Sequence, residues 1–313
     1  MKKFVITGAL GHIGSYFVRF LAKEYDEVEI VMVDNLSSQR FPSLYNLPKG
    51  PKYSFIDEDI RDLDFSDILS DADFCIHFAA ITDAAGSFDN AEELEANNFE
   101  CTSKIAKQCA NYQVKLITLS STSVYGTQKE IVAEDCSDEE LKPQSPYAST
   151  KLKEESLIRD LIYSEKLESI ILRFGTIYGT SPGMRFHTAV NKFCYQAAFK
   201  KPITVWSTAY DQKRPYLDID DASRAIAHII KNNLFNGETY NVLSNNSTVR
   251  EVTDLIKKNC PNLEISFVSN EIMNQLSYEV SNKKFKDTGF EFEGNLEKRI
   301  AETLELLQLN KYH

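Results

Sequence analysis

The first half of the chain alternates short apolar runs with longer stretches whose apolar residues recur at helical spacing. The run at 28–33 stops at the polar pair Asp34-Asn35, as a buried strand stops where it reaches the surface. Strands this apolar that alternate with helices indicate a parallel sheet covered by helices on both faces. The expected strands are residues 4–6, 28–33, 53–56, 74–78, 115–119 and 169–174, and the expected helices are residues 14–25, 90–111 and 147–165.

The order of elements becomes mixed after about residue 175. Gly179, Pro182 and Gly183 predict a loop, which short strands and further helices follow. The pattern therefore predicts an α/β fold: a doubly wound parallel sheet in residues 1–175 and a smaller mixed α+β lobe in residues 176–313, with some later segments returning to the first domain. The expected helices lie near 184–200, 220–232, 248–259 and 295–308, and the expected strands at 203–206 and 215–219.

Composition and charge exclude several classes of protein. The 313 residues contain 35 Lys+Arg and 46 Asp+Glu, a formal charge of −11, so the surface as a whole does not attract nucleic acid or an anionic membrane. No apolar run approaches the ~20 residues that span a bilayer, and the N-terminal apolar stretch is too short for a secretory signal. The six cysteines are scattered, without metal-ligand spacing, so we expect a cytoplasmic protein with no metal site.

A glycine-rich turn follows the first expected strand. Gly8, Gly11 and Gly14 form a G-x-x-G-x-x-G run that leads into a helix. Glycine suits such a turn because it adopts positive φ and lets a pyrophosphate approach the backbone N–H groups at the helix N-terminus. Asp34 ends the next strand 20 residues after Gly14, where a carboxylate accepts from ribose hydroxyls and repels a 2′-phosphate. The sequence therefore predicts an NAD site, with Arg40 nearby as a group that softens the preference for NAD over NADP.

Two further segments lie where a dinucleotide would pass. Asp59-Ile60 follows the third strand, where a carboxylate meets the adenine amino group; a solvated acidic turn at 57–59 is the alternative. His77 to Ala80 ends the fourth strand with small residues, as close passage of a cofactor requires. We interpret His77 itself as a packed histidine.

Tyr147 and Lys151 stand four residues apart on one face of a helix, so the ammonium can lower the pKa of the phenol. A tyrosine and a lysine at this spacing occur by chance in many helices, so the spacing alone does not identify a catalytic pair. A hydroxyl-rich segment at 120–123 follows the fifth strand, at the sheet edge where ligands of open α/β sheets bind. Ser121 can hold a substrate alcohol toward Tyr147, and the chain has no G-x-S-x-G turn of a serine hydrolase.

Together these motifs resemble the extended short-chain dehydrogenase/reductases, the Rossmann-fold family of nucleotide-sugar epimerases, dehydratases and 4-dehydrogenases. The resemblance runs end to end through T-G-x-x-G-x-x-G, D-N-L-S, D-I-R-D, H-F-A-A, S-S-T-S-V-Y-G and S-P-Y-A-S-T-K. It implies that Tyr147 is the base, that Lys151 lowers its pKa and holds the nicotinamide ribose, and that Ser121 binds the reacting hydroxyl. The implied NAD contacts are Gly8, Gly11, His12, Ile13, Gly14, Asp34, Asn35, Asp59, Ile60, Ala79, Ala80, Asn98, Ser120, Tyr147 and Lys151.

The chain also departs from the family pattern. Dehydratases carry Asp-Glu directly after the catalytic Ser or Thr, and Thr122-Ser123 stands there in this chain, which argues against 4,6-dehydration. Arg214 resembles the arginine that clamps the phosphates of a sugar diphosphate, although its neighbours differ from the family's. Arg185, Asn191 and Trp206 are explained equally well as nucleotide contacts or as ordinary packing. The expected substrate contacts are Ser87, Ser121, Thr122, Thr176, Arg185, Asn191 and Arg214.

The resemblance implies NAD-dependent oxidation of a nucleotide-diphosphate sugar, at C4, that yields a 4-keto sugar or a C4-epimerised sugar. Dehydrogenation of an unusual sugar such as an activated heptose fits the altered pocket. The alternatives are a reductase of a non-nucleotide alcohol or ketone and a non-catalytic NAD-binding regulator. A homodimer is expected through helices 90–111 and 147–165, whose apolar positions core burial explains equally well.

Overall fold

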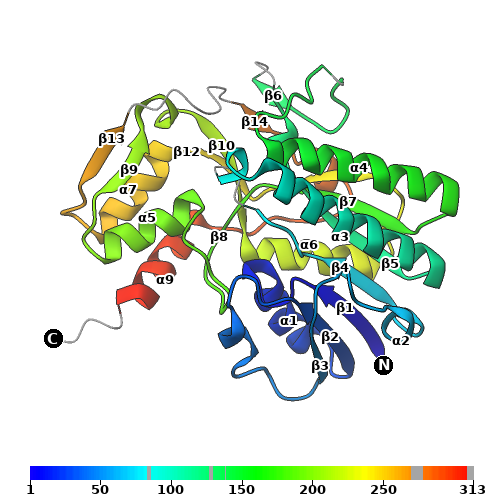
Figure 1. The fold of residues 1–313 in the computed structure, drawn as a ribbon. Coiled ribbons are helices and arrows are strands. Elements are labelled where there is room, and N and C mark those ends of the chain that lie inside the picture. Colours follow the sequence, from blue (N-terminus) through cyan, green and yellow to red (C-terminus); the bar gives the residue numbers. More distant parts are fainter. Residues whose placement is uncertain (83–85, 127–129, 138, 269–277, 309–313) are drawn as a thin grey trace.

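A computed structural model describes residues 1–82, 86–126, 130–137, 139–268 and 278–308 (Figure 1). Its largest sheet has seven strands in the order β11-β7-β5-β4-β1-β2-β3, all parallel. This confirms the predicted doubly wound sheet. The strands are β1 (Lys2–Thr7), β2 (Val28–Asp34), β3 (Lys52–Asp57), β4 (Phe74–His77), β5 (Lys115–Ser121), β7 (Ser169–Phe174) and β11 (Thr239–Val242).

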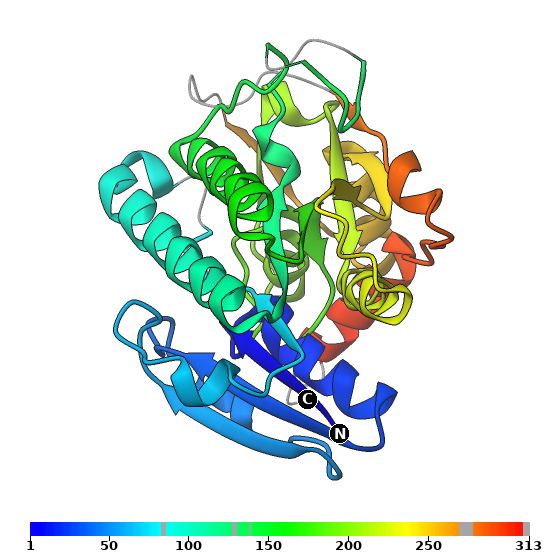
Figure 2. The same ribbon diagram turned by 90° about the vertical axis from the view of Figure 1, so that its right-hand side faces the viewer.

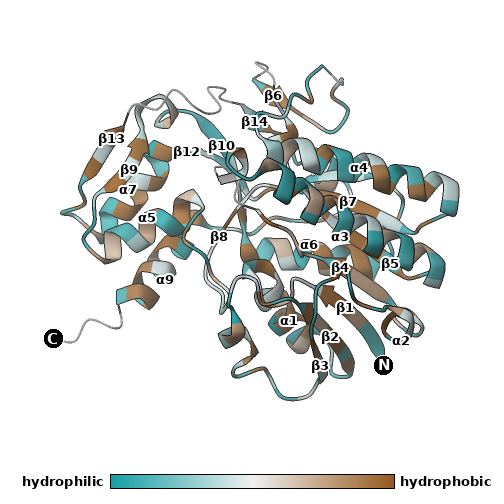
Figure 3. Ribbon diagram, viewed as in Figure 1, coloured by the Kyte–Doolittle hydropathy of each residue, from teal (hydrophilic) through white to brown (hydrophobic). Residues whose placement is uncertain are grey.

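Helices cover both faces of this sheet because alternate residues of each strand point to opposite sides. Phe4 and Ile6 of β1 pack in one core with α1 (His12–Glu24) and α6 (Ile219–Asn232), and Val5 packs in a second core on the other face. That second core includes α3 (Ala91–Tyr112) and α4 (Pro146–Glu165), which lie side by side in Figure 2. In Figure 3 the hydrophobic colour predominates along β1 and β2, as two-sided burial requires.

The smaller lobe is built from short strands and helices of the second half of the chain. Its three-stranded sheet has the order β12-β10-β8, and two-stranded pairs join β13 to β9 and β14 to β6. The strands are β6 (Ile131–Val132), β8 (Thr176–Tyr178), β9 (Ile203–Trp206), β10 (Lys213–Asp218), β12 (Asn245–Thr248), β13 (Ile265–Val268) and β14 (Glu279–Val280). The remaining helices are α2 (Ser66–Leu69), α5 (Ala189–Ala198), α7 (Val249–Asn259), α8 (Lys283–Lys286) and α9 (Leu296–Gln308).

Most expected elements are present, but the helix expected at 184–200 begins only at Ala189. Residues 184–188 are irregular because Gly183 docks on the glycine-rich turn: its backbone N–H donates to Ser15 Oγ at 2.9 Å. A Cβ on Gly183 would lie 2.3 Å from the carbonyl oxygen of Leu10, so the approach is closer than any other residue allows. The chain also returns to the large sheet as α6 and β11, while the boundary near residue 175 stays a prediction.

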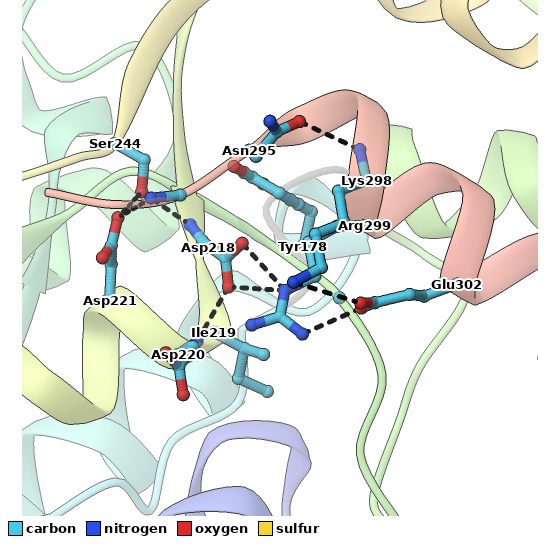
Figure 4. Close-up of polar contacts among 12 residues, drawn as sticks. Tyr178, Asp218, Ile219, Asp220, Asp221, Ser244, Asn295, Lys298, Arg299 and Glu302 are labelled. Atoms are coloured by element: carbon cyan, nitrogen blue, oxygen red, sulfur yellow. Dashed lines mark hydrogen bonds and ion pairs between the residues drawn. The ribbon is translucent and has the colours of Figure 1, made fainter.

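An ion pair joins the last helix to the start of α6 (Figure 4). Nε of Arg299, on α9, lies 3.0 and 2.9 Å from the two carboxylate oxygens of Asp218, whose carboxylate also caps α6. Asp221 accepts from Ser244 Oγ at 2.6 Å and from the backbone N–H of Gly294 at 2.8 Å. These bonds join residues 294–299 to α6, which packs in the same core as α1.

Candidate active site

The glycine-rich turn between β1 and α1 has the shape that a bound pyrophosphate needs. Gly8 has φ +65°, and a Cβ on it would lie 2.6 Å from the backbone nitrogen of Ala79. A Cβ on Gly14 would lie 2.4 Å from the carbonyl oxygen of Gly8. Gly11 stands at the N-cap of α1 and supplies no side-chain cap, and the first turn of the helix has no acidic residue. The N–H groups and the positive end of this helix are therefore available to an anion.

Carboxylates meet the turn at the ends of the neighbouring strands. Asp34, at the end of β2, accepts from the backbone N–H groups of Leu10 and Leu36, each at 3.0 Å, and burial raises the pKa of its carboxyl group. Asn35 Nδ2 donates to Asp59 Oδ2 at 3.0 Å. The guanidinium of Arg61 also binds Asp59 through two bonds of 2.8 and 2.9 Å and holds the pKa of that carboxyl well below its usual range. Ile60 is buried beside them.

The segment after β4 closes the other side of the turn. The amide of Asn98 binds the backbone of Ile81 at both ends, accepting from its N–H at 2.8 Å and donating to its carbonyl at 2.9 Å. The described contacts of Asn98 thus position the segment that contains Ala79 and Ala80. His77 contacts Thr7 Oγ1 through Nδ1 at 2.7 Å and Thr102 Oγ1 through Nε2 at 3.1 Å. Burial lowers its pKa to about 3, so His77 is a neutral, packed histidine.

Ser121, Tyr147 and Lys151 lie at the carboxyl end of β5 and in the first turns of α4. Ser145 caps α4 by accepting from the N–H of Ala148 at 3.2 Å, which fixes Tyr147 at the start of the helix. Lys151 Nζ lies 5.8 Å from the centre of the Tyr147 ring. The hydroxyl of Ser121 accepts from Ser123 N at 3.1 Å and lies 2.8 Å from Ser123 Oγ.

Burial and the positive charges around Tyr147 have opposite effects on the pKa of the Tyr147 phenol. Burial raises the pKa of the Tyr147 phenol, and the carboxylate of Glu154 adds to the rise, whereas Lys151 and Arg185 lower it. The sequence motifs did not predict a role for Glu154. Its Oε2 lies 2.8 Å from Lys151 Nζ. The signal in the sequence was an acidic residue three positions after Lys151, on the same face of the expected helix.

A buried network of hydrogen bonds joins α4 to β5 and β7. Arg173, on β7, donates through Nε and Nη2 to the two oxygens of Glu155 on α4 at 2.8 and 2.7 Å. Ser120 Oγ donates to the same carboxylate at 2.6 Å, so its hydroxyl is engaged in this network. Thr122 is buried and donates to the carbonyl of Phe174 at 3.2 Å. The described hydroxyl bonds of Ser120 and Thr122 are therefore structural, and their contacts with NAD and substrate stay predictions.

The segment before α5 covers the glycine-rich turn. His12 Nδ1 lies 2.6 Å from Ser181 Oγ, and its Nε2 lies 3.4 Å from Asn191 Nδ2. Asn191 holds Gly179 through two backbone bonds of 3.2 and 3.1 Å, a structural use of a residue expected at the nucleotide. Burial and the nearby guanidinium of Arg185 lower the pKa of His12 to about 3, so this imidazole is neutral. Ile13 follows, half-buried, in the first turn of α1.

Arginines bring local positive charge to the same region of an acidic protein. Arg185 contacts the hydroxyl of Thr82 after β4 and lies 2.9 Å from His187 Nε2. Arg40 lies close enough to Asp34 and Arg185 for both charges to act on it. Such a cluster favours phosphate groups above the turn.

The other expected substrate contacts lie on several elements. Arg214, on β10, donates to Gln212 Oε1 at 2.6 Å and lies over the ring of Tyr278 at 5.9 Å. Thr176 stands on β8, the parallel neighbour of β10, and is half-buried. Ser87 is buried in the short turn before α3.

A sequence profile described as the NAD dependent epimerase/dehydratase family matches residues 4–242. The chain belongs to this family. An uncharacterized UDP-glucose epimerase of Bacillus subtilis is 30% identical over 264 residues, which cover 82% of this chain and 81% of that protein. A trifunctional UDP-glucose 4,6-dehydratase/epimerase/reductase of Arabidopsis thaliana is 28% identical over 97% of this chain, which spans only 47% of that longer protein.

The fold of this epimerase/dehydratase matches solved structures. UDP-glucuronic acid 4-epimerase from Bacillus cereus, crystallised with UDP-glucuronic acid and NAD, superposes with a TM-score of 0.87 at 24% identity, over 98% of this chain and 99% of that one. Family membership confirms the expectation of an NAD-dependent enzyme, and the cradle of Gly8, Gly11 and Gly14 fits that cofactor. Among the described residues no helix is long and apolar enough to span a membrane.

Proposed function

We propose that this epimerase/dehydratase oxidises a nucleotide-diphosphate sugar at a ring hydroxyl, at C4, with Tyr147 as the base. The observation that carries the proposal is the placement of Ser121, Tyr147 and Lys151 at the sheet edge where the glycine-rich turn also lies. Ligands of open α/β sheets bind at this edge. A phenol, an ammonium and a hydroxyl there suit abstraction of an alcohol proton.

In the proposed reaction Ser121 orients the sugar hydroxyl and Tyr147 takes its proton. NAD, held at the glycine-rich turn, would supply the acceptor for a hydride from the same carbon. Because burial raises the pKa of Tyr147 in the protein alone, the phenol needs additional positive charge to act near neutral pH. Lys151 supplies one such charge. To bring the phenol from its ordinary pKa of about 10 to about 7, the site must stabilise the phenolate by about 4 kcal/mol relative to the phenol.

The residues of the site favour oxidation or epimerisation at C4 over elimination of water from the sugar. The residues directly after Ser121 are hydroxyl-bearing, and the hydroxyl of Thr122 is bonded to a backbone carbonyl. Elimination needs a second acid–base pair beside the sugar, and Thr122-Ser123 does not supply one. The product is therefore a 4-keto sugar, if the intermediate leaves, or the C4 epimer, if hydride returns to its other face.

The substrate is proposed to be held by its phosphates. Arg185 and Arg214 come from different segments of the second half of the chain, and a guanidinium suits a diphosphate because it donates in a planar fork. The names of the Bacillus relatives, a UDP-glucose epimerase and a UDP-glucuronic acid 4-epimerase, make UDP-hexoses the first substrates to test. An activated heptose belongs in the same panel.

We further propose a cytoplasmic homodimer that pairs α3 and α4 with their copies. The outer face of α4 carries Tyr163, which is 92% exposed, and α3 ends at Tyr112, which is 37% exposed. Light scattering of the purified protein tests this directly: a mass near twice 35.6 kDa supports the dimer, and a mass near 35.6 kDa refutes it.

The function is tested with a panel of nucleotide sugars followed by mass spectrometry and NMR. Loss of two mass units signals net oxidation, and unchanged mass with altered ring couplings signals epimerisation. Tyr147→Phe is expected to abolish turnover and keep its bound NAD, whereas Tyr163→Phe, an exposed tyrosine on the same helix, keeps both. Turnover of a simple alcohol or ketone without any nucleotide sugar would overturn the proposed substrate class. Undiminished turnover by Tyr147→Phe would overturn the assigned base.

A further inference from the structure

The Lys151 ammonium is paired with an acid inside the protein. Its Nζ lies 2.8 Å from Oε2 of Glu154, and the two side chains are only 5% and 6% exposed. Both residues lie on α4, one turn apart, and both line a small cavity between α4 and β5. The charge that is expected to activate Tyr147 is therefore largely neutralised before any ligand binds.

Burial of the Glu154 carboxylate at this position has a cost in folding free energy. Its other oxygen, Oε1, is buried and has no hydrogen-bond partner among the described residues. Burial raises the pKa of the Glu154 carboxyl group, and the nearby hydroxyl of Thr102 on α3, which also lies 3.1 Å from His77 Nε2, acts against that rise. A buried carboxylate with an unpaired oxygen costs stability, and an apolar side chain of similar size is often more stable in such a place. Glu154 is therefore tied to the buried ammonium of Lys151, whose charge it compensates.

The charged and titratable groups around the pair come from several elements. Glu154 and Lys151 act on Tyr147 from α4, and Arg185 acts on it from the segment before α5. Lys151 also faces Glu155 on α4 and His77 on β4, which is neutral. Cys101 faces Glu154 from α3 and is an un-ionised thiol, because burial raises its pKa to about 12. Among these groups Glu154 is the negative charge that acts on both members of the pair and contacts the ammonium directly.

We propose that Glu154 is a positioning residue that holds Lys151 in place and keeps a proton on the Tyr147–Lys151 pair. The inference rests on the proposed role of Tyr147. Removal of the negative charge leaves the ammonium uncompensated, so the first proton of the pair leaves at lower pH. For a unit charge several ångströms away in a protein interior, the expected shift is about one pH unit.

The test is an ultraviolet titration of phenolate at 295 nm on the NAD-loaded protein. Subtracting the titration of the matching Tyr147→Phe protein isolates Tyr147 from the other 14 of the 15 tyrosines. Glu154→Gln is expected to move the midpoint down by about one unit, and Glu154→Leu, which tests the same loss if the amide variant does not fold, is expected to do likewise. Glu154→Asp keeps the charge and is expected to keep the wild-type midpoint. Glu165→Gln removes an exposed charge from the same helix and serves as the control.

The result that overturns the proposal is a Tyr147 midpoint unchanged in folded Glu154→Gln or Glu154→Leu. An equal shift in Glu154→Asp also overturns it, because charge would then not be the cause. The titration needs no substrate, so a failure of the proposed sugar chemistry leaves it interpretable. Once a substrate is found, the acidic limb of the rate profile is expected to move by the same amount in Glu154→Gln.

Discussion

Replacement of Arg173 by methionine is expected to destabilise the protein strongly, because it removes the buried cation that pairs with the Glu155 carboxylate in the core. Arg173 and Glu155 are 2% and 1% exposed, and two short bonds of 2.8 and 2.7 Å join them. Breaking one side of a buried pair costs about 3–5 kcal/mol. Arg159, 2.6 Å from the same carboxylate but 45% exposed, compensates in part, which places the loss near the lower figure.

Thermal unfolding measures this loss. A cost of about 3 kcal/mol lowers Tm by about 5 °C for a chain of this size. Replacing both members with methionine is expected to restore much of the stability, because no charge is then left alone. Arg159→Met removes the exposed partner only and is expected to cost less than about 1 kcal/mol. A Tm of Arg173→Met within about 2 °C of wild type, or a double variant less stable than the single, refutes the reasoning.

The same pair gives a pH dependence with a definite sign. Burial opposes ionisation of Glu155, but the donors from Arg173 and Ser120 outweigh it, so its pKa is lowered on folding. The ionised pair therefore contributes stability above the ordinary pKa of about 4.3, and this contribution is lost as pH falls through the folded value. In Arg173→Met the lone carboxylate takes up a proton more readily. The deficit of the variant is thus expected to be largest near pH 7 and to narrow on acidification toward pH 4; a constant deficit contradicts the assignment.

Two further predictions concern the Arg299–Asp218 ion pair and the glycine-rich turn. Arg299→Ala is expected to lower stability by about 1–3 kcal/mol, since buried Asp218 then keeps its capping bond but loses its ion-pair partner. Neighbouring Lys298→Ala, with a 72% exposed side chain, is expected to change Tm little; equal effects would contradict the role of the pair. Gly14→Ala is expected to reduce NAD bound per protein at least tenfold, because the added Cβ meets the Gly8 carbonyl at 2.4 Å; full cofactor content after gentle purification would show that the turn tolerates it.

The parallel sheet could be predicted from sequence because its strands are short runs of apolar residues separated by helical patterns. β1 and β2 are nearly free of polar residues along their centres, and this pattern has few explanations other than two-sided burial. The short strands β8, β11 and β12 were not predicted, since three or four residues carry too little periodicity. They form through pairing with strands distant in the sequence, which no local pattern records.

The site was predictable where its chemistry depends on residue type at fixed spacing, as for Gly8, Gly11, Tyr147 and Lys151. It was not predictable where it depends on which side chains meet. Nothing in the spacing shows that the hydroxyl of Ser120 turns into the core to bind Glu155. The loop at 184–188 was expected to be helical because its docking on the glycine-rich turn is a contact between distant segments.

The central claim is tested most directly with a nucleotide sugar that carries deuterium at C4. After the NAD-loaded protein is mixed with this sugar and quenched with cold alkali, in which the reduced nicotinamide survives, mass spectrometry of the released cofactor shows where the label is. The account predicts deuterium on the reduced nicotinamide with the wild-type protein and with Tyr163→Phe, and none with Tyr147→Phe. Product that forms while all label stays on C4 of the sugar and none reaches the cofactor, or equal labelling by Tyr147→Phe, would contradict it.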